Sequence, residues 1–200
     1  KSKLEKKLQT KCVTCEATPR YLYHPSSPKR VFEILPNAKF IILLRNPIDR
    51  AYSHYQMEVS SGNEKLSFDN AINEEKNRIS TDMERMTNDE NFYSVNFYRK
   101  SYLTRGIYVD QIKRWFKYFP RNQFLIIQSE DLYSDTPKIY SDVLNFLNLP
   151  KFELDSFKAH RMRKYSDINS ETRKKLVDYF KPHNTKLNEL LKRDFNWENE

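Results

Sequence analysis

The sequence predicts an α/β fold with a parallel sheet, and three observations support that prediction. Two short apolar runs, residues 39–44 and 123–128, carry the β-branched isoleucines that are typical of buried strands. Stretches with apolar residues at helical spacing lie between and around these runs. Proline, asparagine and glycine mark where the stretches end, so strands and helices alternate along the chain. Such alternation is typical of units whose strands run parallel.

The first predicted elements are a helix over residues 28–35, ended by Pro36, and the strand over residues 39–44. Because this strand is continuously apolar, we expect both of its faces to be buried. Pro47 then stands near the first turn of a second helix, which ends around Gly62. The region 9–21 is a further candidate for a short strand.

The middle of the chain predicts a short helix over residues 67–79, capped by Ser67. Residues 80–99 are polar and rich in asparagine, which favours a long surface loop. Residues 106–119 form an amphipathic pattern with one broad apolar face, which predicts a helix.

The C-terminal elements begin with the second strand, residues 123–128. A helix over residues 137–147 is expected next, with Thr136 as its N-cap. Two helices, residues 170–180 and 185–191, are predicted to be separated at Pro182.

Length and composition are those of one domain spanning residues 1–200, with 38% hydrophobic and 31% charged residues. The net charge of +8 favours an anionic partner, such as a nucleotide, a sulfated polymer, nucleic acid or an acidic membrane. We do not expect nucleic acid, because no groove-reading motif is present. No apolar run approaches the roughly 20 residues of a membrane-spanning helix, so none is expected.

The cysteines, Cys12 and Cys15, form a single C-x-x-C, which is half of a zinc site. The four histidines are scattered without ligand spacing. We therefore expect no metal site and no chemical role for these thiols.

A phosphate site is indicated where the first strand ends. Arg45 directly follows that strand, and ligands of open α/β sheets bind beyond the carboxyl ends of the strands. Its guanidinium suits bidentate phosphate binding, and Ser53 lies about one turn into the next helix, whose N-terminal end favours an anion. The alternative is that Arg45 pairs with Asp49 and that Ser53 is an ordinary helix residue.

The segment KFIILLRNPIDRAYSHYQ, residues 39–56, resembles the 3′-phosphate-binding segment of sulfotransferases that use 3′-phosphoadenosine 5′-phosphosulfate (PAPS). The resemblance implies that Arg45 and Ser53 hold the 3′-phosphate of the donor. It also implies a P-loop-like three-layer sandwich around the parallel sheet.

Further segments resemble this family between about Cys15 and Trp197. Residues 16–21 look like its G-E-x-(S/T)-P-x-Y element, with Cys15 where glycine is usual, which implies that Glu16 and Thr18 face the acceptor. Near the C-terminus, a basic stretch resembles the R-K-Y loop that closes over the nucleotide in heparan-type and bacterial members. The residues of that stretch are Arg161, Arg163, Lys164 and Tyr165.

The family's glycine-rich turn, K-x-G-T-(S/T), has no counterpart here, because the only glycines are Gly62 and Gly106. We therefore expect the N-terminal strand–loop–helix unit to be absent and leave the catalytic residues unassigned. Truncation, favoured by a first residue that is Lys1, and a degenerate homologue are the two explanations. The chain by itself is expected not to transfer sulfate.

The resemblance implies a sulfotransferase that moves a sulfuryl group from PAPS, its co-substrate, to a hydroxyl or amine acceptor, without a metal. The acceptor, a carbohydrate or a small molecule, is not encoded in a short motif. A cytoplasmic location is expected, with the Golgi lumen as the alternative. The competing hypothesis is a non-catalytic module that binds a nucleotide or a sulfated glycan.

Overall fold

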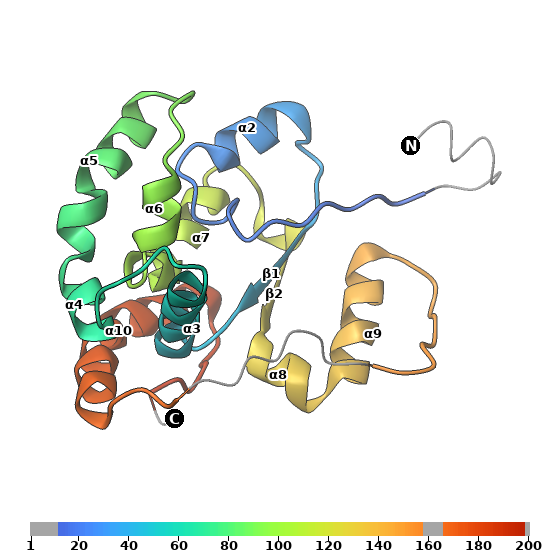
Figure 1. Ribbon diagram of the computed structural model, residues 1–200. Coiled ribbons are helices and arrows are strands. Elements are labelled where there is room, and N and C mark those ends of the chain that lie inside the picture. Colours follow the sequence, from blue (N-terminus) through green and yellow to red (C-terminus); the bar gives the residue numbers. More distant parts are fainter. Residues whose placement is uncertain (1–11, 158–165, 199–200) are drawn as a thin grey trace.

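The computed structural model describes residues 12–157 and 166–198, and in these ranges helices surround a small parallel sheet (Figure 1). The sheet pairs β1 (Phe40–Leu44) with β2 (Phe124–Gln128), so that Phe40 lies opposite Phe124 and Leu44 opposite Gln128. The prediction of an α/β fold with a parallel sheet is confirmed, and both strands fall where the apolar runs placed them.

Helices make up most of the rest of the described chain. They are α2 (Ser27–Ile34), α3 (Pro47–Ser60), α4 (Phe68–Asn73), α5 (Glu75–Asn88), α6 (Val95–Lys100), α7 (Tyr108–Phe116), α8 (Ser129–Ser134), α9 (Thr136–Leu147) and α10 (Ser170–Leu191), with 3₁₀ turns η1 (Thr104–Gly106) and η2 (Arg121–Gln123). The helices expected before the first strand, after it and around residues 106–119 are therefore confirmed. The candidate strand in region 9–21 does not form within its described part.

The sheet is covered unequally on its two faces. Ile42 and Leu44 on β1 are buried in a core shared with α7 and the end of α10. On the opposite face, Ile41 is 38% exposed and Leu43 is 51% exposed. The expectation that β1 is buried on both faces is therefore wrong for the described chain. The helices α8 and α9 pack against the neighbouring strand β2, and the side chains of Ile41 and Leu43 on β1 stay exposed.

The predicted surface loop over residues 80–99 is also wrong. This stretch forms the larger part of α5, a short turn and α6, and we call residues 75–100 the α5–α6 hairpin. Ile79 and Met86 are the buried hydrophobic side chains of α5, and most of its other side chains are polar. The Ser94 side chain caps α6 by accepting a hydrogen bond from the Phe97 amide. Two buried apolar side chains seven residues apart are a weak helical pattern, and they are easily overlooked in a polar sequence.

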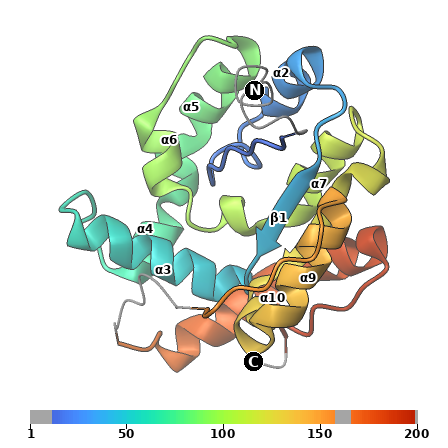
Figure 2. The same ribbon diagram turned by 90° about the vertical axis from the view of Figure 1, so that its right-hand side faces the viewer.

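The α5–α6 hairpin has a hydrophobic core of its own. Its members come from the hairpin and from the chain that precedes α2, and they are Tyr23, Ile79, Met86, Phe97 and Tyr98. Figure 2 shows the chain before α2 lying between the hairpin and β1.

Two helix ends differ from the prediction. Asp135, and not Thr136, caps α9 by accepting a hydrogen bond from the Lys138 amide, while the Thr136 hydroxyl donates to the Leu132 carbonyl. In addition, α10 continues through Pro182 as one helix. A proline inside a helix costs about 3 kcal/mol. Burial of α10 side chains on both sides of the proline, against α3 and α7, offsets that cost.

Gly106 lies where η1, the start of α3 and the middle of α10 meet. A Cβ atom added to it would lie 2.9 Å from Phe180 Cε1 and 3.1 Å from Pro47 Cβ. The Phe180 ring is fully buried and the proline ring cannot rotate away, so neither neighbour can yield easily.

Gly106→Ala is therefore expected to lower the free energy of unfolding by about 1–3 kcal/mol, which is the usual cost of overpacking a core. Urea denaturation of the two proteins would measure the difference. An unchanged urea midpoint would contradict the tight contact between the three elements.

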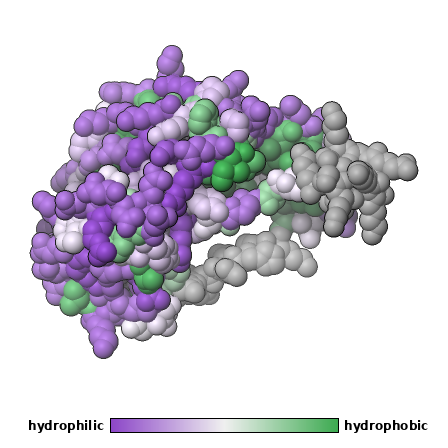
Figure 3. All heavy atoms as spheres, turned by 90° about the horizontal axis from the view of Figure 1, so that it is seen from above, coloured by the Kyte–Doolittle hydropathy of each residue, from purple (hydrophilic) through white to green (hydrophobic). Residues whose placement is uncertain are grey.

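Within the described ranges, none of the helices combines the length and the apolar character needed to cross a bilayer. The view in Figure 3 shows a face on which hydrophilic side chains predominate and hydrophobic ones gather only in small areas.

Candidate functional site

The backbone around Arg45 is held by hydrogen bonds from three elements. The Tyr108 hydroxyl on α7 donates to the Arg45 carbonyl over 2.9 Å. The Asn46 amide donates to the Glu130 carboxylate on α8, also over 2.9 Å. The Asn46 side chain in turn caps α3 by accepting a hydrogen bond from the Ile48 amide. These contacts fix the point where β1 ends and α3 begins.

The side chains of Arg45 and Ser53 are partly exposed at this point. Neither has a hydrogen-bond or ion-pair partner within residues 12–157 and 166–198. The alternative pairing of Arg45 with Asp49 does not form, since Asp49 pairs with Arg173 on α10. A guanidinium before a helix and a hydroxyl in its second turn can together bind an anion.

The predicted nucleotide-closing residues Arg161, Arg163, Lys164 and Tyr165 lie outside the described residues. The chain that follows them returns to α3, because the Ser166 hydroxyl lies 3.4 Å from the Tyr52 hydroxyl.

Glu16 is exposed and Thr18 partly exposed, on the segment that precedes α2. A hydrogen bond with the Glu16 carboxylate raises the pKa of the Tyr21 hydroxyl above its usual value. The segment is fixed to η1, because the Arg105 guanidinium donates to the Pro19 carbonyl over 2.9 Å. The structure thus connects Pro19, which directly follows Thr18, with η1.

A row of arginines connects this segment with the end of β1. Its members, in order, are Arg20, Arg105, Arg50 and Arg45, and each is close enough to the next for their charges to interact. Burial, and then the charge of Arg50, lower the pKa of Arg105 to about 10. Burial is also the main cause that lowers the pKa of Arg50, whose guanidinium donates to the Tyr102 carbonyl.

The described part of the chain supplies no ion pair to any of the four arginines. The carboxylate of Glu75, whose charge Arg50 does feel, is buried and accepts hydrogen bonds from the Leu103 amide and from the amide and hydroxyl of Thr104. Arg45, Arg50 and Arg105 are partly buried, whereas Arg20 is exposed. Partly buried cations without a paired anion are unfavourable, so the row favours the binding of an anion.

His54 on α3 does not add to this charge. Burial is the main cause that lowers its pKa to about 3, and the nearby Arg50 acts in the same direction. The ring is therefore neutral at physiological pH.

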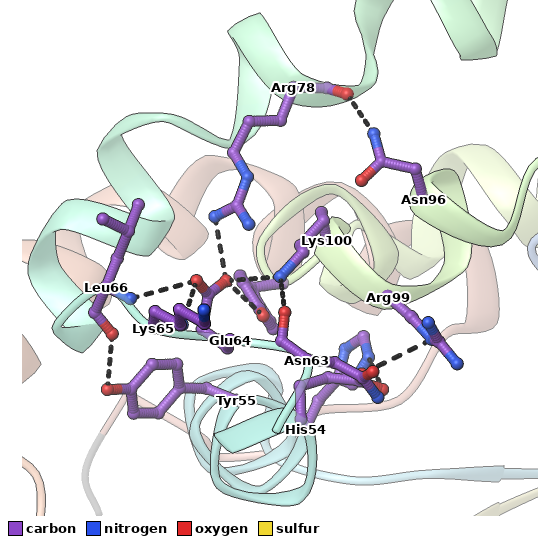
Figure 4. A network of polar contacts seen from close by, with 12 residues as sticks. His54, Tyr55, Asn63, Glu64, Lys65, Leu66, Arg78, Asn96, Arg99 and Lys100 are labelled. Carbon is purple, nitrogen blue, oxygen red and sulfur yellow. Dashed lines mark hydrogen bonds and ion pairs between the residues drawn. The ribbon is translucent and has the colours of Figure 1, made fainter. Parts of the chain in front are cut away.

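A buried carboxylate fixes the α5–α6 hairpin to the loop that follows α3 (Figure 4). Glu64 Oε2 accepts hydrogen bonds from Arg78 over 2.8 Å, Lys100 over 3.0 Å and Tyr102 over 2.8 Å. Glu64 Oε1 accepts from the Lys65 and Leu66 amides. Burial would raise the pKa of Glu64, but these donors together lower it to about 2. This cluster, which we call the Glu64 network, sets the position of Tyr102 and hence of the carbonyl that Arg50 contacts.

A hollow of about 270 Å³ lies between α3, α4 and the start of α10. Tyr52, Tyr55 and Phe68 line it together with the carboxylates of Asp69 and Asp167. Its negative groups make it a poor site for a phosphate.

Nowhere in the described ranges do three or more His, Cys, Asp or Glu residues gather as a metal site would need, and the expected absence of a metal stays a prediction.

Arg45 directly follows β1, as the sequence predicted, and Ser53 lies on α3, whereas the row of arginines was not predicted. Arg20 could have been noticed, since it directly follows the T-P pair of residues 18–19. The approach of Arg105 to Arg50 depends on the tertiary fold, so a local pattern does not predict it.

Comparison with known proteins gives a consistent result. The sulfotransferase domain family matches residues 10–196. The crystal structure of a sulfotransferase from Alicyclobacillus acidocaldarius superposes with a TM-score of 0.71 at 29% identity, covering 90% of this chain and 65% of that one.

Curated relatives include three named sulfotransferases. The membrane-associated sulfotransferase kil1 of Dictyostelium discoideum is 27% identical over 92% of this chain and 53% of its own length. The human bifunctional heparan sulfate N-deacetylase/N-sulfotransferase 3 is 30% identical over 88% of this chain and 22% of its own. The human heparan sulfate glucosamine 3-O-sulfotransferase 5 is 27% identical over 92% and 56%, respectively. The chain thus spans about half or less of the length of these relatives.

Proposed function

Because the chain belongs to the sulfotransferase domain family, we propose that it carries the 3′-phosphate-binding part of a sulfotransferase that uses PAPS. The supporting observation is that Arg45 directly follows β1 and Ser53 lies on α3. Neither side chain has a hydrogen-bond or ion-pair partner among the described residues. In this proposal Arg45 forms a bidentate contact with the 3′-phosphate, and Ser53 donates one further hydrogen bond. Arg161, Arg163, Lys164 and Tyr165 would close over the nucleotide.

The proposed reaction is an in-line displacement at sulfur. The acceptor oxygen or nitrogen forms the new bond to sulfur, and the bond from sulfur to the phosphate oxygen of PAPS breaks. The electron pair leaves with the bisphosphate product, and the acceptor loses its proton to a base that we do not assign. Positioning and charge neutralisation supply most of the rate, by analogy with phosphoryl transfer.

The acceptor is proposed to be a hydroxyl or amine compound that approaches Glu16 and Thr18. Two of the relatives are named for heparan sulfate, which supports a carbohydrate as acceptor. We propose that no metal takes part. A cytoplasmic location is retained as a proposal, with the Golgi lumen as its alternative; one relative is named as membrane-associated.

Calorimetric titration with adenosine 3′,5′-bisphosphate, the reaction product, tests the donor assignment. The bisphosphate should bind more tightly than adenosine 5′-phosphate, because only the bisphosphate carries the group that Arg45 and Ser53 are proposed to read. Equal affinities for the two nucleotides would contradict the proposal.

Ser53→Ala is expected to weaken binding of the bisphosphate by about 2- to 10-fold, since one neutral hydrogen bond contributes about 0.5–1.5 kcal/mol. Ser60→Ala, at the far end of α3, makes the same chemical change away from the site and should leave the affinity as it is. If both variants lose affinity equally, Ser53 does not contact the nucleotide.

A further inference from the structure

Two guanidinium groups lie over tyrosine rings beside the segment that contains Thr18. Arg20 Cζ is 5.1 Å from the centre of the Tyr98 ring and 5.9 Å from that of Tyr93. Arg105 Cζ is 5.8 Å from the centre of the Tyr23 ring. We call these five residues the arginine–tyrosine cluster.

The rings of the cluster are fixed by the α5–α6 hairpin and its core. Tyr23 stacks on Phe97 with ring centres 4.7 Å apart, and Tyr98 is buried. Tyr93 packs against Tyr98 at 5.4 Å, yet 51% of Tyr93 is exposed. The cluster therefore has a rigid base and one tyrosine that is free to contact a ligand.

Among the described residues, the two cations are held by neutral groups only. Arg20 donates to the Tyr93 hydroxyl, and Arg105 donates to the Pro19 carbonyl. Burial is the first cause that raises the pKa of Tyr98 to about 12, so this phenol stays neutral and does not offset the charge above it. The proximity of Arg20 lowers the pKa of Arg105 further, which shows that the two charges repel each other. An anion beside both guanidiniums would relieve this repulsion.

We propose that the arginine–tyrosine cluster binds an acidic group of the acceptor, a carboxylate or sulfate carried on a sugar ring, and that the ring packs against Tyr93. This inference rests on the proposed sulfotransferase function and adds the residues that select the acceptor. The cluster lies beside the Thr18 segment, at the opposite end of the row of arginines from Arg45. Arg20 thereby becomes a specificity-determining residue that favours acidic over neutral carbohydrates.

Calorimetric titration with two tetrasaccharides tests this inference. Hyaluronan tetrasaccharide carries glucuronate carboxylates, and N-acetylchitotetraose has the same number of rings without them. The wild-type protein should bind the acidic sugar more tightly. Arg20→Ala should weaken that binding by about 5- to 20-fold, in the range expected for a charge-assisted hydrogen bond at a partly exposed site. Arg20→Lys should restore part of the loss, because it keeps the charge without the planar fork.

Arg85→Ala is the matched control. Arg85 lies on the same hairpin, its guanidinium is 3.8 Å from the centre of the Phe92 ring, and its removal changes the net charge equally. The affinity of the Arg85→Ala variant for the acidic sugar should equal that of the wild type. Tyr93→Phe removes only the hydroxyl that holds Arg20, so it should have a minimal effect on folding. We expect this variant to bind the acidic sugar about 2- to 5-fold more weakly than the wild type.

Several results would overturn the inference. Equal losses in Arg20→Ala and Arg85→Ala would mean that net charge alone attracts the sugar. Failure of the wild type to prefer the acidic sugar would exclude the cluster as an acceptor site. A parallel loss of adenosine 3′,5′-bisphosphate affinity in Arg20→Ala would assign the cluster to the donor. Binding of the bisphosphate by the wild type, measured separately, reports on the proposed function itself, so the two failures are distinguishable.

Discussion

Arg45→Ala is expected to weaken binding of adenosine 3′,5′-bisphosphate by roughly 10- to 150-fold. A charge-assisted contact typically contributes about 1.5–3 kcal/mol, and the variant removes the only cation that follows directly on the carboxyl end of β1. The backbone of this residue is held by the Tyr108 hydroxyl, so truncating the side chain should leave the strand end in place. Calorimetry on the folded variant would measure the loss.

Three comparisons sharpen this experiment. Arg45→Lys keeps the charge but loses the bidentate geometry, so its affinity should fall between those of the wild type and Arg45→Ala. Arg121→Ala removes an exposed guanidinium whose partner is the Leu190 carbonyl, and it should bind the nucleotide normally. The affinity for adenosine 5′-phosphate should be nearly the same in the wild type and in all of these variants, because this nucleotide lacks the 3′-phosphate. If Arg45→Ala binds the bisphosphate as the wild type does, the phosphate assignment is wrong.

The second large effect is expected at the Glu64 network. Glu64→Ala leaves Arg78, Lys100 and Tyr102 without their shared acceptor, and both Lys100 and Tyr102 are buried. Removing one partner of a buried ion pair costs about 3–5 kcal/mol. We therefore expect a loss of that size in the free energy of unfolding, measured by urea denaturation. A loss below about 1 kcal/mol would mean that water or a rearranged carboxylate replaces Glu64.

The pH dependence of this effect has a definite sign. The folded pKa of Glu64, about 2, lies below its usual value of 4.5. The ionised carboxylate therefore stabilises the fold fully above about pH 4.5, and this contribution is lost as the pH falls from there towards 2. The difference in unfolding free energy between the wild type and Glu64→Gln should narrow over that range. Glu189→Gln, an exposed site on α10, serves as the control and should show no such trend.

Local patterns were sufficient for the parts of the fold that depend on neighbouring residues. The apolar runs predicted both strands, and Pro47 predicted the start of α3. These two predictions together located Arg45 at the end of a strand. The same patterns failed where distant contacts decide. Pro182 ends a helix by local rules, yet α10 continues because both of its halves pack against other helices. The exposed face of β1 could not be foreseen either, since both of its faces are apolar in sequence.

The residues of the candidate site also fall into two groups, those that a local motif predicts and those that depend on the tertiary fold. Arg45 and Ser53 are eight positions apart, so one local motif contains both. The arginine–tyrosine cluster combines the chain before α2, the turn and second helix of the α5–α6 hairpin, and η1. No local pattern can predict that Arg20 comes to lie above Tyr98, because this contact depends on how the hairpin docks.

The hairpin's separate core has a consequence for how such a protein can diversify. Its buried side chains form a cluster distinct from the one beneath β1. A substitution that repacks one cluster should have little effect on the other, since the stability changes caused by substitutions at distant sites are close to additive. Selection can therefore vary the tyrosines and the turn of the hairpin in small steps while the strand end that carries Arg45 keeps its geometry. The physical division of the core therefore allows substitutions in the hairpin that leave the packing beneath β1 largely unchanged.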